Sequence, residues 1–246
     1  RKKMEFDFII LDKTESTNSE ALELAKFTDK PTFIIAKKQT QGRGRIDRSW
    51  SDPSGNFSGS ILLKIDEDLQ NLALRSFVAA VSVFDAVSQK IGNEHELSIK
   101  WPNDLLLNGK KICGMLLETK SLCTGNALVI GIGVNLLSTP DLDEMENVSI
   151  KPGSILGETG INIDPIEFSK IIAHQYALRE NQFRTKGFSV IRQIWLDRAA
   201  KLGEKITART PNFEHSGIFD SLDEKGQLII KANGEKKKIA AAEIFF

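Results

Sequence analysis

The residues from Gln39 to Trp50 carry the side chains in this chain that are best suited to holding an anion. The stretch reads QTQGRGRIDRSW and contains three arginines and two glycines. A planar guanidinium binds a carboxylate or a phosphate through two parallel hydrogen bonds. Glycines let the backbone approach a ligand closely and offer its amide groups. The segment predicts an anion clamp; a solvated loop and a nucleic-acid patch are the alternatives.

The overall charge argues against the nucleic-acid patch. The chain has 246 residues with 33 Lys and Arg and 33 Asp and Glu, so its formal net charge is zero. Domains that bind polyanions through their general field are usually basic. The positive charge of the arginine segment is therefore local, and we expect no nucleic-acid partner.

A second group of charged residues surrounds a predicted turn. The segment 100–116 reads KWPNDLLLNGKKICGML, and Asn-Gly between apolar runs is a strong signal for a two-residue hairpin turn. In that register Asp104 faces Cys113 across the hairpin, and Leu106 faces Lys111. Asp104, Leu106, Lys111 and Cys113 then share one face. The Cβ atoms of Asp104 and Lys111 would be diagonal neighbours about 7–8 Å apart, close enough to hold one small ligand.

Each of these charged residues has a chemical and an ordinary interpretation. A lysine at position 111 can stabilise negative charge that develops in a transition state, whereas an exposed strand-edge lysine is the ordinary alternative. Lys110 points to the opposite face by strand alternation and is expected to be solvated. Asp104 suits a nucleotide that carries Mg²⁺, which takes one or two carboxylates and keeps several waters. A turn cap is the alternative for Asp104.

Two further motifs lie at predicted element ends. In ESTNSEA, residues 15–21, Thr17 and Glu20 form a predicted capping box at a helix N-terminus. In GIGVN, residues 131–135, the third glycine and the following helix of a dinucleotide motif are missing. We therefore interpret Gly131 and Gly133 as positions of close packing.

The spacing of apolar residues predicts the elements that position these side chains. Strands are expected at 6–11, 32–36, 57–65 and 128–136, and helices at 17–27, 73–90, 166–183 and 189–202. The arginine segment, up to about residue 56, is expected to be one long loop, and such loops are often functional. A surface loop is expected at 138–149. After residue 203 short strands alternate with turns, so we predict two domains, 1–203 and 204–246.

Cysteine usage and hydropathy place the chain in a broad class. The two cysteines, Cys113 and Cys123, do not suggest a disulfide framework, which favours a reduced, cytoplasmic setting. No histidine lies near Cys113 in the sequence, so it is expected to pack in the core and not to act as a nucleophile. The longest apolar run, 77–87, is shorter than the roughly 20 residues of a membrane span, and no membrane association is expected.

Four motifs in order, ESTNSEA, QTQGRGRIDRSW, KWPNDLLLNGKKICGML and GIGVN, resemble the biotin–protein ligase family. These enzymes attach biotin to a lysine of biotin-dependent carboxylases. The similarity is close from Ser16 to Asn135 and rests on size and strand pattern after that. It implies an α+β fold with a mixed, largely antiparallel sheet flanked by helices, like the catalytic core of class II aminoacyl-tRNA synthetases. A small Src-homology-3-like β-barrel is expected to follow.

The resemblance also implies an activity and a set of site residues. Biotin would react with ATP to give biotinyl-5′-adenylate and pyrophosphate, and a biotin carboxyl carrier protein would then accept the biotin. Mg²⁺ would arrive with ATP, near Asp104, without a metal site of its own in the protein. Lys111 and Arg45 are the implied catalytic residues. The implied biotin contacts are Ser16, Thr17, Asn18, Gln39, Gly42, Arg43, Gly44, Arg45 and Lys111. The implied ATP contacts are Arg45, Arg48, Trp50, Asn103, Asp104 and Asn135.

Several alternatives stay open at this point. A ligase or transferase for lipoate or octanoate is the main alternative activity. Trp50 is expected either to stack on adenine or to fasten the end of the loop. A DNA-binding regulator is disfavoured because the predicted first strand begins at Phe6 and leaves no room for a helix-turn-helix. A non-catalytic biotin-binding module is disfavoured because Lys111 and Arg45 are both present. The resemblance leaves a homodimer open.

One departure from the family pattern is visible in the arginine segment. Relatives commonly read Gly-Arg-Gly-Arg-Arg-Gly-Arg, whereas this chain has Ile46 and Asp47 in place of the third arginine and third glycine. The exchange removes one cation and adds one anion. We expect an adenylate to be held less tightly as a result.

Overall fold

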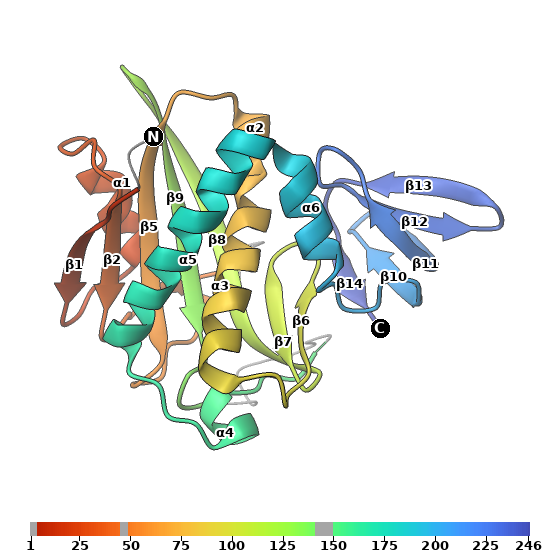
Figure 1. The fold of residues 1–246 in the computed structure, drawn as a ribbon, viewed down its shortest axis with the longest axis horizontal. Helices are drawn as coiled ribbons and strands as arrows, with labels where there is room; N and C mark the ends of the chain where they lie inside the picture. The colour runs from red at the N-terminus through yellow and green to blue at the C-terminus, as the bar shows by residue number, and fades with distance from the viewer. Residues whose placement is uncertain (1–3, 45–48, 141–149) are drawn as a thin grey trace.

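A seven-stranded sheet forms the centre of the molecule in the computed structural model, which describes residues 4–44, 49–140 and 150–246. The strand order is β1-β2-β5-β9-β8-β7-β6 (Figure 1). The strands are β1 Asp7–Leu11, β2 Thr32–Ala36, β5 Phe57–Ile65, β6 Leu97–Lys100, β7 Asp104–Leu107, β8 Lys110–Leu122 and β9 Gly125–Val134. Only β1 and β2 pair in parallel among these described strands. The predicted mixed, largely antiparallel sheet is confirmed.

The β7–β8 hairpin turns where the sequence predicts, but its register shifts after the second residue pair, Leu106 with Lys111. Asn108 and Gly109 have φ values of 51° and 77°, which the tight turn requires. Beyond the turn Leu105, and not Asp104, pairs with Cys113, and the ladder contains a bulge. The predicted pairing of Asp104 with Cys113 is therefore wrong. The extra residue lets Ile112 and Cys113 both enter the core, so Cys113 does not share a face with Lys111.

The position of Cys113 bears out its interpretation as a packing residue. The side chain is buried in the main core, and burial raises the pKa of its thiol well above the ordinary value. A thiol with a raised pKa is a poor nucleophile at neutral pH. Both cysteines are free, and Cys123 is exposed.

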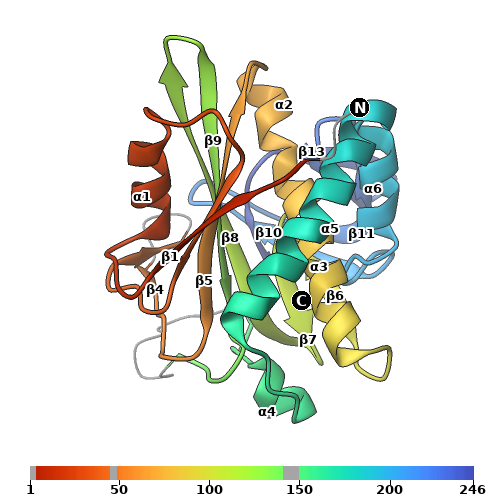
Figure 2. The same cartoon turned by 60° about the vertical axis from the view of Figure 1, so that its left-hand side comes forward.

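Helices cover the two faces of the sheet unequally. The short helix α1, Thr17–Leu24, lies alone on one face, whereas α3, Arg75–Ile91, α5, Pro165–Lys186, and α6, Phe188–Leu196, lie on the other (Figure 2). Helix α2, Leu69–Ala73, leads into α3, and α4, Ile155–Thr159, precedes α5. Under α1 the packing residues are small, with Ala21 and Ala25 lying on Ile34, Leu62 and Val129. The thin α1 layer leaves part of its sheet face open.

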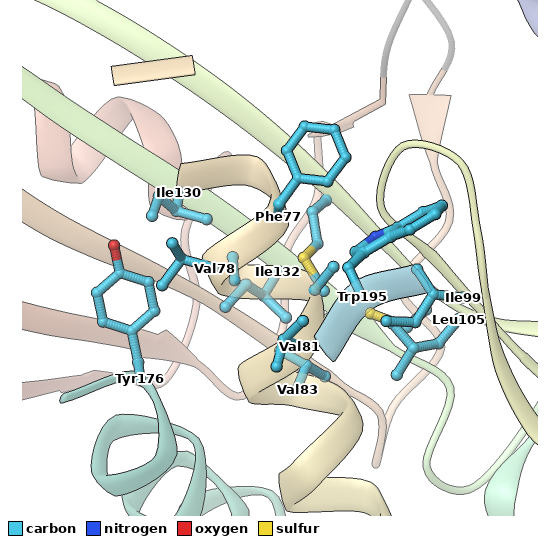
Figure 3. Close-up of a cluster of buried hydrophobic side chains, with 14 of the residues drawn as sticks. Phe77, Val78, Val81, Val83, Ile99, Leu105, Ile130, Ile132, Tyr176 and Trp195 are labelled. Atoms are coloured by element: carbon cyan, nitrogen blue, oxygen red, sulfur yellow. The ribbon is translucent and has the colours of Figure 1, made fainter. Parts of the chain in front are cut away.

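The thick side of the molecule holds most of the core. Val78 and Val81 of α3 lie beside Ile130 and Ile132 of β9, and Tyr176 of α5 borders the cluster (Figure 3). Phe77 of α3 packs against Trp195 of α6, with ring centroids 5.7 Å apart. The stretch Leu69–Ile91 is long and apolar enough to cross a membrane by composition, which exceeds the predicted run at 77–87. Of its most apolar window, 67% is buried inside the molecule, as expected for the central helix of a protein core.

Two predicted helix ends need correction. Ser16, and not Thr17, is the N-cap of α1, since its hydroxyl accepts from the Ser19 amide. The Glu20 carboxylate accepts instead from the Thr14 hydroxyl at 2.7 Å, so the predicted Thr17–Glu20 capping box is wrong. Helix α6 ends at Leu196, well before the predicted residue 202, because the chain leaves the helix to bond with β6. The Ile99 amide donates to the Arg198 carbonyl at 2.8 Å.

The end of the chain forms a second, five-stranded antiparallel sheet in the order β13-β12-β11-β10-β14. Its strands are β10 Lys205–Arg209, β11 Glu214–Leu222, β12 Leu228–Ala232, β13 Glu235–Ile239 and β14 Glu243–Phe245. These strands confirm the predicted β-rich C-terminal part. The Trp101 indole N–H donates to the Gly226 carbonyl at 3.0 Å, so the turn between β11 and β12 is anchored on the main body.

Candidate active site

A pocket lies on the sheet face that carries α1, and small residues form its floor. Two rows run across β5, β9 and β8: Ser58, Gly133 and Gly114, then Ser60, Gly131 and Leu116. A Cβ on Gly131 would lie 2.4 Å from Asn18 Oδ1, and one on Gly133 would lie 2.4 Å from Trp50 Cε2. Both glycines therefore let another side chain lie directly on the sheet, which confirms their interpretation as positions of close packing.

Uncharged hydrogen-bonding groups line the end of the pocket at the N-terminus of α1. The Thr17 amide and hydroxyl both donate to Gln39 Oε1, at 2.9 and 3.3 Å. Ser60 Oγ lies 2.7 Å from Thr17 Oγ1 and 2.6 Å from Asn18 Oδ1. Ser16 completes this wall. The structure thus brings together four of the residues that the sequence predicts for biotin, in a preformed network.

The arginine segment begins and ends in a short ladder. Strands β3, Gly42–Arg43, and β4, Ser49–Trp50, pair Gly42 with Trp50, so part of the predicted loop has regular structure. A Cβ on Gly114 would lie 3.0 Å from the Trp50 ring, and the ring also covers Gly133. Trp50 therefore fastens the end of the segment onto the sheet. Gly42 packs between Gln39 and the Trp50 backbone and is not among the described residues that line the pocket, whereas Arg43 and Gly44 are.

Arg43 reaches toward the neutral end of the pocket. Its guanidinium forms an ion pair with Glu118 of β8 at 2.8 Å, and its side chain is 45% exposed. The same carboxylate oxygen accepts from the Asn18 amide nitrogen at 2.7 Å. The sequence analysis did not single out Glu118.

The opposite end of the pocket carries a pair of charges. Lys111 Nζ lies 2.8 Å from Asp104 Oδ2, and the two side chains are 33% and 7% exposed. The prediction that Lys111 and Asp104 are neighbours is confirmed. The bulge separates Cys113 from them, because it turns that side chain to the other face of the sheet. Lys110 forms an ion pair with Glu158 at 2.7 Å, so it is partnered and not merely solvated. Lys111 is left as the lysine that lines the pocket among the described residues.

A second, larger cavity adjoins this charged end. Asp104 and Lys111 line both cavities, and the larger one extends to Lys225 and Glu243 of the C-terminal sheet. Its wall includes three further residues that the sequence predicts for ATP: Trp50, Asn103 and Asn135. The two cavities also share Gly44, Trp50, Met115 and Leu116, and Lys111 and Asp104 are the charged residues that line both in the described part of the chain.

Two buried asparagines in the larger cavity have unused acceptors. The Asn103 side-chain nitrogen donates to the Ser76 hydroxyl at 2.8 Å, and that of Asn135 donates to the Gly153 carbonyl at 3.0 Å. Neither Oδ1 atom has a hydrogen-bond partner within the described ranges. A buried acceptor without a partner is costly, so we expect a donor from a bound ligand or a water at each oxygen.

Asp52 supports the base of the arginine segment from below. Its Oδ2 accepts from the Gln39 amide at 2.9 Å. Burial raises the pKa of this carboxyl to about 6, although the Gln39 amide opposes the shift. Asp52 therefore titrates in the mildly acidic range.

Arg45 and Arg48, together with Ile46 and Asp47, lie outside the described residues. The described residues contain no cluster of three or more His, Cys, Asp or Glu side chains that could hold a metal ion. Asp104 is the carboxylate in the smaller pocket within that part of the chain, and it is paired with Lys111.

The sequence analysis missed several residues that support the site. Ser58, Ser60, Gly114 and Glu118 lie on the sheet, and Asp52 lies in the loop before β5. A weak signal existed for two of them, because Ser58 and Ser60 alternate in a strand whose other residues, apart from Lys64, are not polar. The pairing of these serines with Gly131 and Gly133 depends on strand register, which the sequence did not reveal.

Comparisons with known proteins match most of the chain. The model of the biotin/lipoate A/B protein ligase family matches residues 8–135, and that of the biotin protein ligase C-terminal domain matches 201–246. A biotin–[acetyl-CoA-carboxylase] ligase from Paracoccus denitrificans is 44% identical over 96% of this chain and 99% of its own length. The bifunctional ligase/repressor BirA of Bacillus subtilis is 33% identical over 95% of this chain and 72% of its own.

A solved structure shows the same fold. It is the biotin protein ligase from Aquifex aeolicus in complex with biotin and ATP, which superposes with a TM-score of 0.80 and 26% identity. The match covers 97% of both chains.

Proposed function

The chain belongs to the biotin/lipoate A/B protein ligase family, and we propose that it is a biotin–protein ligase. Biotin is activated with ATP to biotinyl-5′-adenylate and pyrophosphate, and the biotinyl group then passes to a lysine of a biotin carboxyl carrier protein. The 44% identity to a biotin–[acetyl-CoA-carboxylase] ligase supports biotin over lipoate or octanoate. The pair of family matches supports the division into a ligand-binding domain, 1–203, and a small β-domain, 204–246.

The observation that carries the proposal is the polarity of the pocket from end to end. Thr17, Asn18 and Gln39 present uncharged donors and acceptors at one end, as a neutral ureido ring requires. Lys111 presents a cation at the other end, where the pocket meets the larger cavity. A ligand with a neutral, hydrogen-bonding ring and a carboxylate tail matches this order.

The first step follows from that junction. The biotin carboxylate attacks the α-phosphorus of ATP, an O–P bond forms, and the bond to the β-phosphate breaks so that pyrophosphate leaves. No base is needed because the carboxylate is already ionised. Positioning two mutually repelling anions can contribute about 7–11 kcal/mol to the lowering of the barrier. Lys111 is placed to offset the charge that develops between them.

In the second step the carrier protein brings its acceptor lysine to the same junction of the two cavities. The amine of the carrier lysine attacks the carbonyl carbon of the mixed anhydride, the C–O bond to AMP breaks, and the amine loses a proton. We propose that the larger cavity, which opens between Asp104 and the C-terminal sheet, holds the nucleotide, with Asn103 and Asn135 as acceptors for it.

Mg²⁺ fits this site as a companion of the nucleotide. A buried carboxylate at Asp104, beside the cavity proposed for ATP, suits an ion that binds mainly phosphates and water. Mg²⁺ would neutralise phosphate charge, and Asp104 would orient it. The cytoplasmic setting and the absence of a nucleic-acid partner stay predictions from the composition.

A transfer assay tests the proposal directly. The protein is incubated with biotin, MgATP and a biotin carboxyl carrier domain, and the carrier is weighed by mass spectrometry. We expect the carrier to gain the mass of one biotinyl group. Parallel reactions with lipoate and with octanoate, and a carrier whose acceptor lysine is replaced by arginine, serve as controls. A carrier modified by lipoate but not by biotin would overturn the assignment of the substrate.

A further inference from the structure

Glu118 lies at the junction of three elements that meet at the neutral end of the pocket. It belongs to β8, opposite Val129 of β9. One oxygen, Oε2, accepts from Asn18 Nδ2 at 2.7 Å and from Arg43 Nη2 at 2.8 Å. Its side chain is 28% exposed. A single carboxylate oxygen thus joins the first turn of α1 to the base of the arginine segment.

The contact with Asn18 settles which way its amide points. The Asn18 nitrogen faces Glu118 and also the Leu116 carbonyl at 3.3 Å, and its oxygen lies 2.6 Å from Ser60 Oγ. An ionised carboxylate can only accept hydrogen bonds, so it accommodates the amide nitrogen and rejects the amide oxygen. Glu118 therefore fixes the pattern of donors and acceptors along the wall formed by Asn18.

The contact with Arg43 holds the arginine segment at its start. Arg43 directly follows Gly42, which pairs with Trp50, and Trp50 lies on Gly114 and Gly133. The ion pair draws β3 toward β8, beside the row in which Leu116 pairs with Gly131. It also occupies the Arg43 guanidinium at the neutral end, away from Lys111, so the two cations serve different ends of the pocket.

We propose that Glu118 is a positioning residue of the biotin site: it orients the Asn18 amide toward the ligand ring and fastens the arginine segment through Arg43. The inference rests on the proposed function, since it assigns the neutral end of the pocket to biotin. Glu118 acts through these two residues and takes no part in the reaction at Lys111. Its loss therefore affects biotin binding and leaves the chemical step unchanged.

The first test is the isosteric variant Glu118→Gln. Glutamine keeps the shape of glutamate but loses its charge. Its amide nitrogen can donate to the Asn18 side-chain oxygen, so the Asn18 amide is free to rotate by half a turn. We expect the Kd for biotin to rise about tenfold, equivalent to about 1.4 kcal/mol, with kcat at saturating biotin and the KM for ATP unchanged. The matched control is Glu167→Gln, which removes a surface ion pair to Lys90 at 2.6 Å from α5. A biotin Kd equal to that of the natural chain would overturn the proposal.

Two further measurements separate positioning from general stability. In a double-mutant cycle of Glu118→Gln with Arg43→Gln, the effects on biotin Kd are expected to be non-additive, because the two side chains share one contact. Trypsin should cleave the Arg43–Gly44 bond faster in Glu118→Gln than in Glu167→Gln, both without biotin. Additive effects together with equal cleavage would contradict the fastening role.

A conservative variant keeps the test decisive if Glu118→Gln does not fold. Glu118→Asp retains the charge but is one methylene too short to reach both partners, so an intermediate rise in biotin Kd is expected; a natural Kd in this variant would also overturn the proposal. The two hypotheses fail differently. If the natural chain binds lipoate but not biotin, the proposed function is wrong; if it binds biotin and the variants bind it equally well, only the role of Glu118 is wrong.

Discussion

The two ends of the pocket are built in opposite ways. At the α1 end, Thr17, Asn18, Gln39 and Ser60 bond to one another, and an ion pair between Arg43 and Glu118 supports them from the side. At the other end, Lys111 and Asp104 face a larger cavity, and Asn103 and Asn135 hold acceptors without a partner among the described residues.

This difference separates binding from chemistry. A network that forms before the ligand arrives is preorganised and lowers the cost of binding. Charges at the junction of two cavities, with unused acceptors in the larger one, are suited to groups whose charge changes during the reaction. We therefore expect changes at the α1 end to alter biotin affinity and changes at the Lys111 end to alter rate.

The largest effect is expected for Lys111→Ala. Loss of a cation at the developing charge should slow biotin-dependent ATP–pyrophosphate exchange by about 10²–10³-fold, as for other electrostatic contacts of this kind. Biotin binding should remain measurable, because the α1 end is untouched. The control is Lys110→Ala, whose side chain pairs with Glu158 instead. Near-normal exchange in Lys111→Ala would contradict a role for Lys111 in the chemical step.

A smaller effect, on biotin affinity and not on rate, is expected for Ser60→Ala. The change removes the hydroxyl that joins Thr17 and Asn18, a loss of about 1 kcal/mol or about fivefold in biotin Kd. The kcat for transfer should not change. Ser82→Ala is the matched control, since Ser82 is a buried serine that bonds to the Val78 carbonyl on α3. A lower kcat with an unchanged Kd would contradict the division between the two ends.

The third prediction concerns the wall of the larger cavity. Trp101→Phe keeps an aromatic ring but removes the 3.0 Å hydrogen bond to Gly226 in the turn between β11 and β12. Losing a bond of this kind costs about 0.5–1.5 kcal/mol, and we expect it to appear as a few-fold higher KM for ATP. Biotin Kd, measured by calorimetry, should stay constant. Tyr176→Phe, which removes a buried hydroxyl from α5, is the control.

The smallest effect is expected from Asp52, and it appears in stability. The pKa of this carboxyl is about 6 in the folded chain, against an ordinary value of 3.8. Between about pH 4 and pH 6 the folded state binds more protons than the unfolded state, so this group makes the free energy of unfolding fall as pH rises, and its contribution stays lost above pH 6. In Asp52→Asn the loss of stability from pH 5 to pH 8 should be smaller than in the natural chain. Urea unfolding at both pH values measures this difference, and an identical loss in both proteins would show that Asp52 does not titrate as inferred.

Much of the fold follows from local patterns. The strands β2 and β5 and the turn at Asn108-Gly109 lie where the sequence places them, because alternation and positive φ leave little choice. The closeness of Lys111 and Asp104 was also predictable, since both lie within a few residues of that turn. The ends of α1 and α6 were not, because contacts with Thr14 and Ile99 from outside each helix decide them.

Many residues of the site could be identified from the amino-acid sequence, whereas the tertiary structure decided which residues they contact. Thr17, Gln39, Arg43 and Lys111 lie in recognisable motifs, and a motif is a local property of the chain. Glu118 meets Asn18 and Arg43 across 100 and 75 positions. Such a contact depends on the register of β5, β9 and β8 and on the bulge at Ile112, and packing of the whole core sets both. A one-residue change of register would turn Glu118 away from the pocket, although the local sequence would be the same.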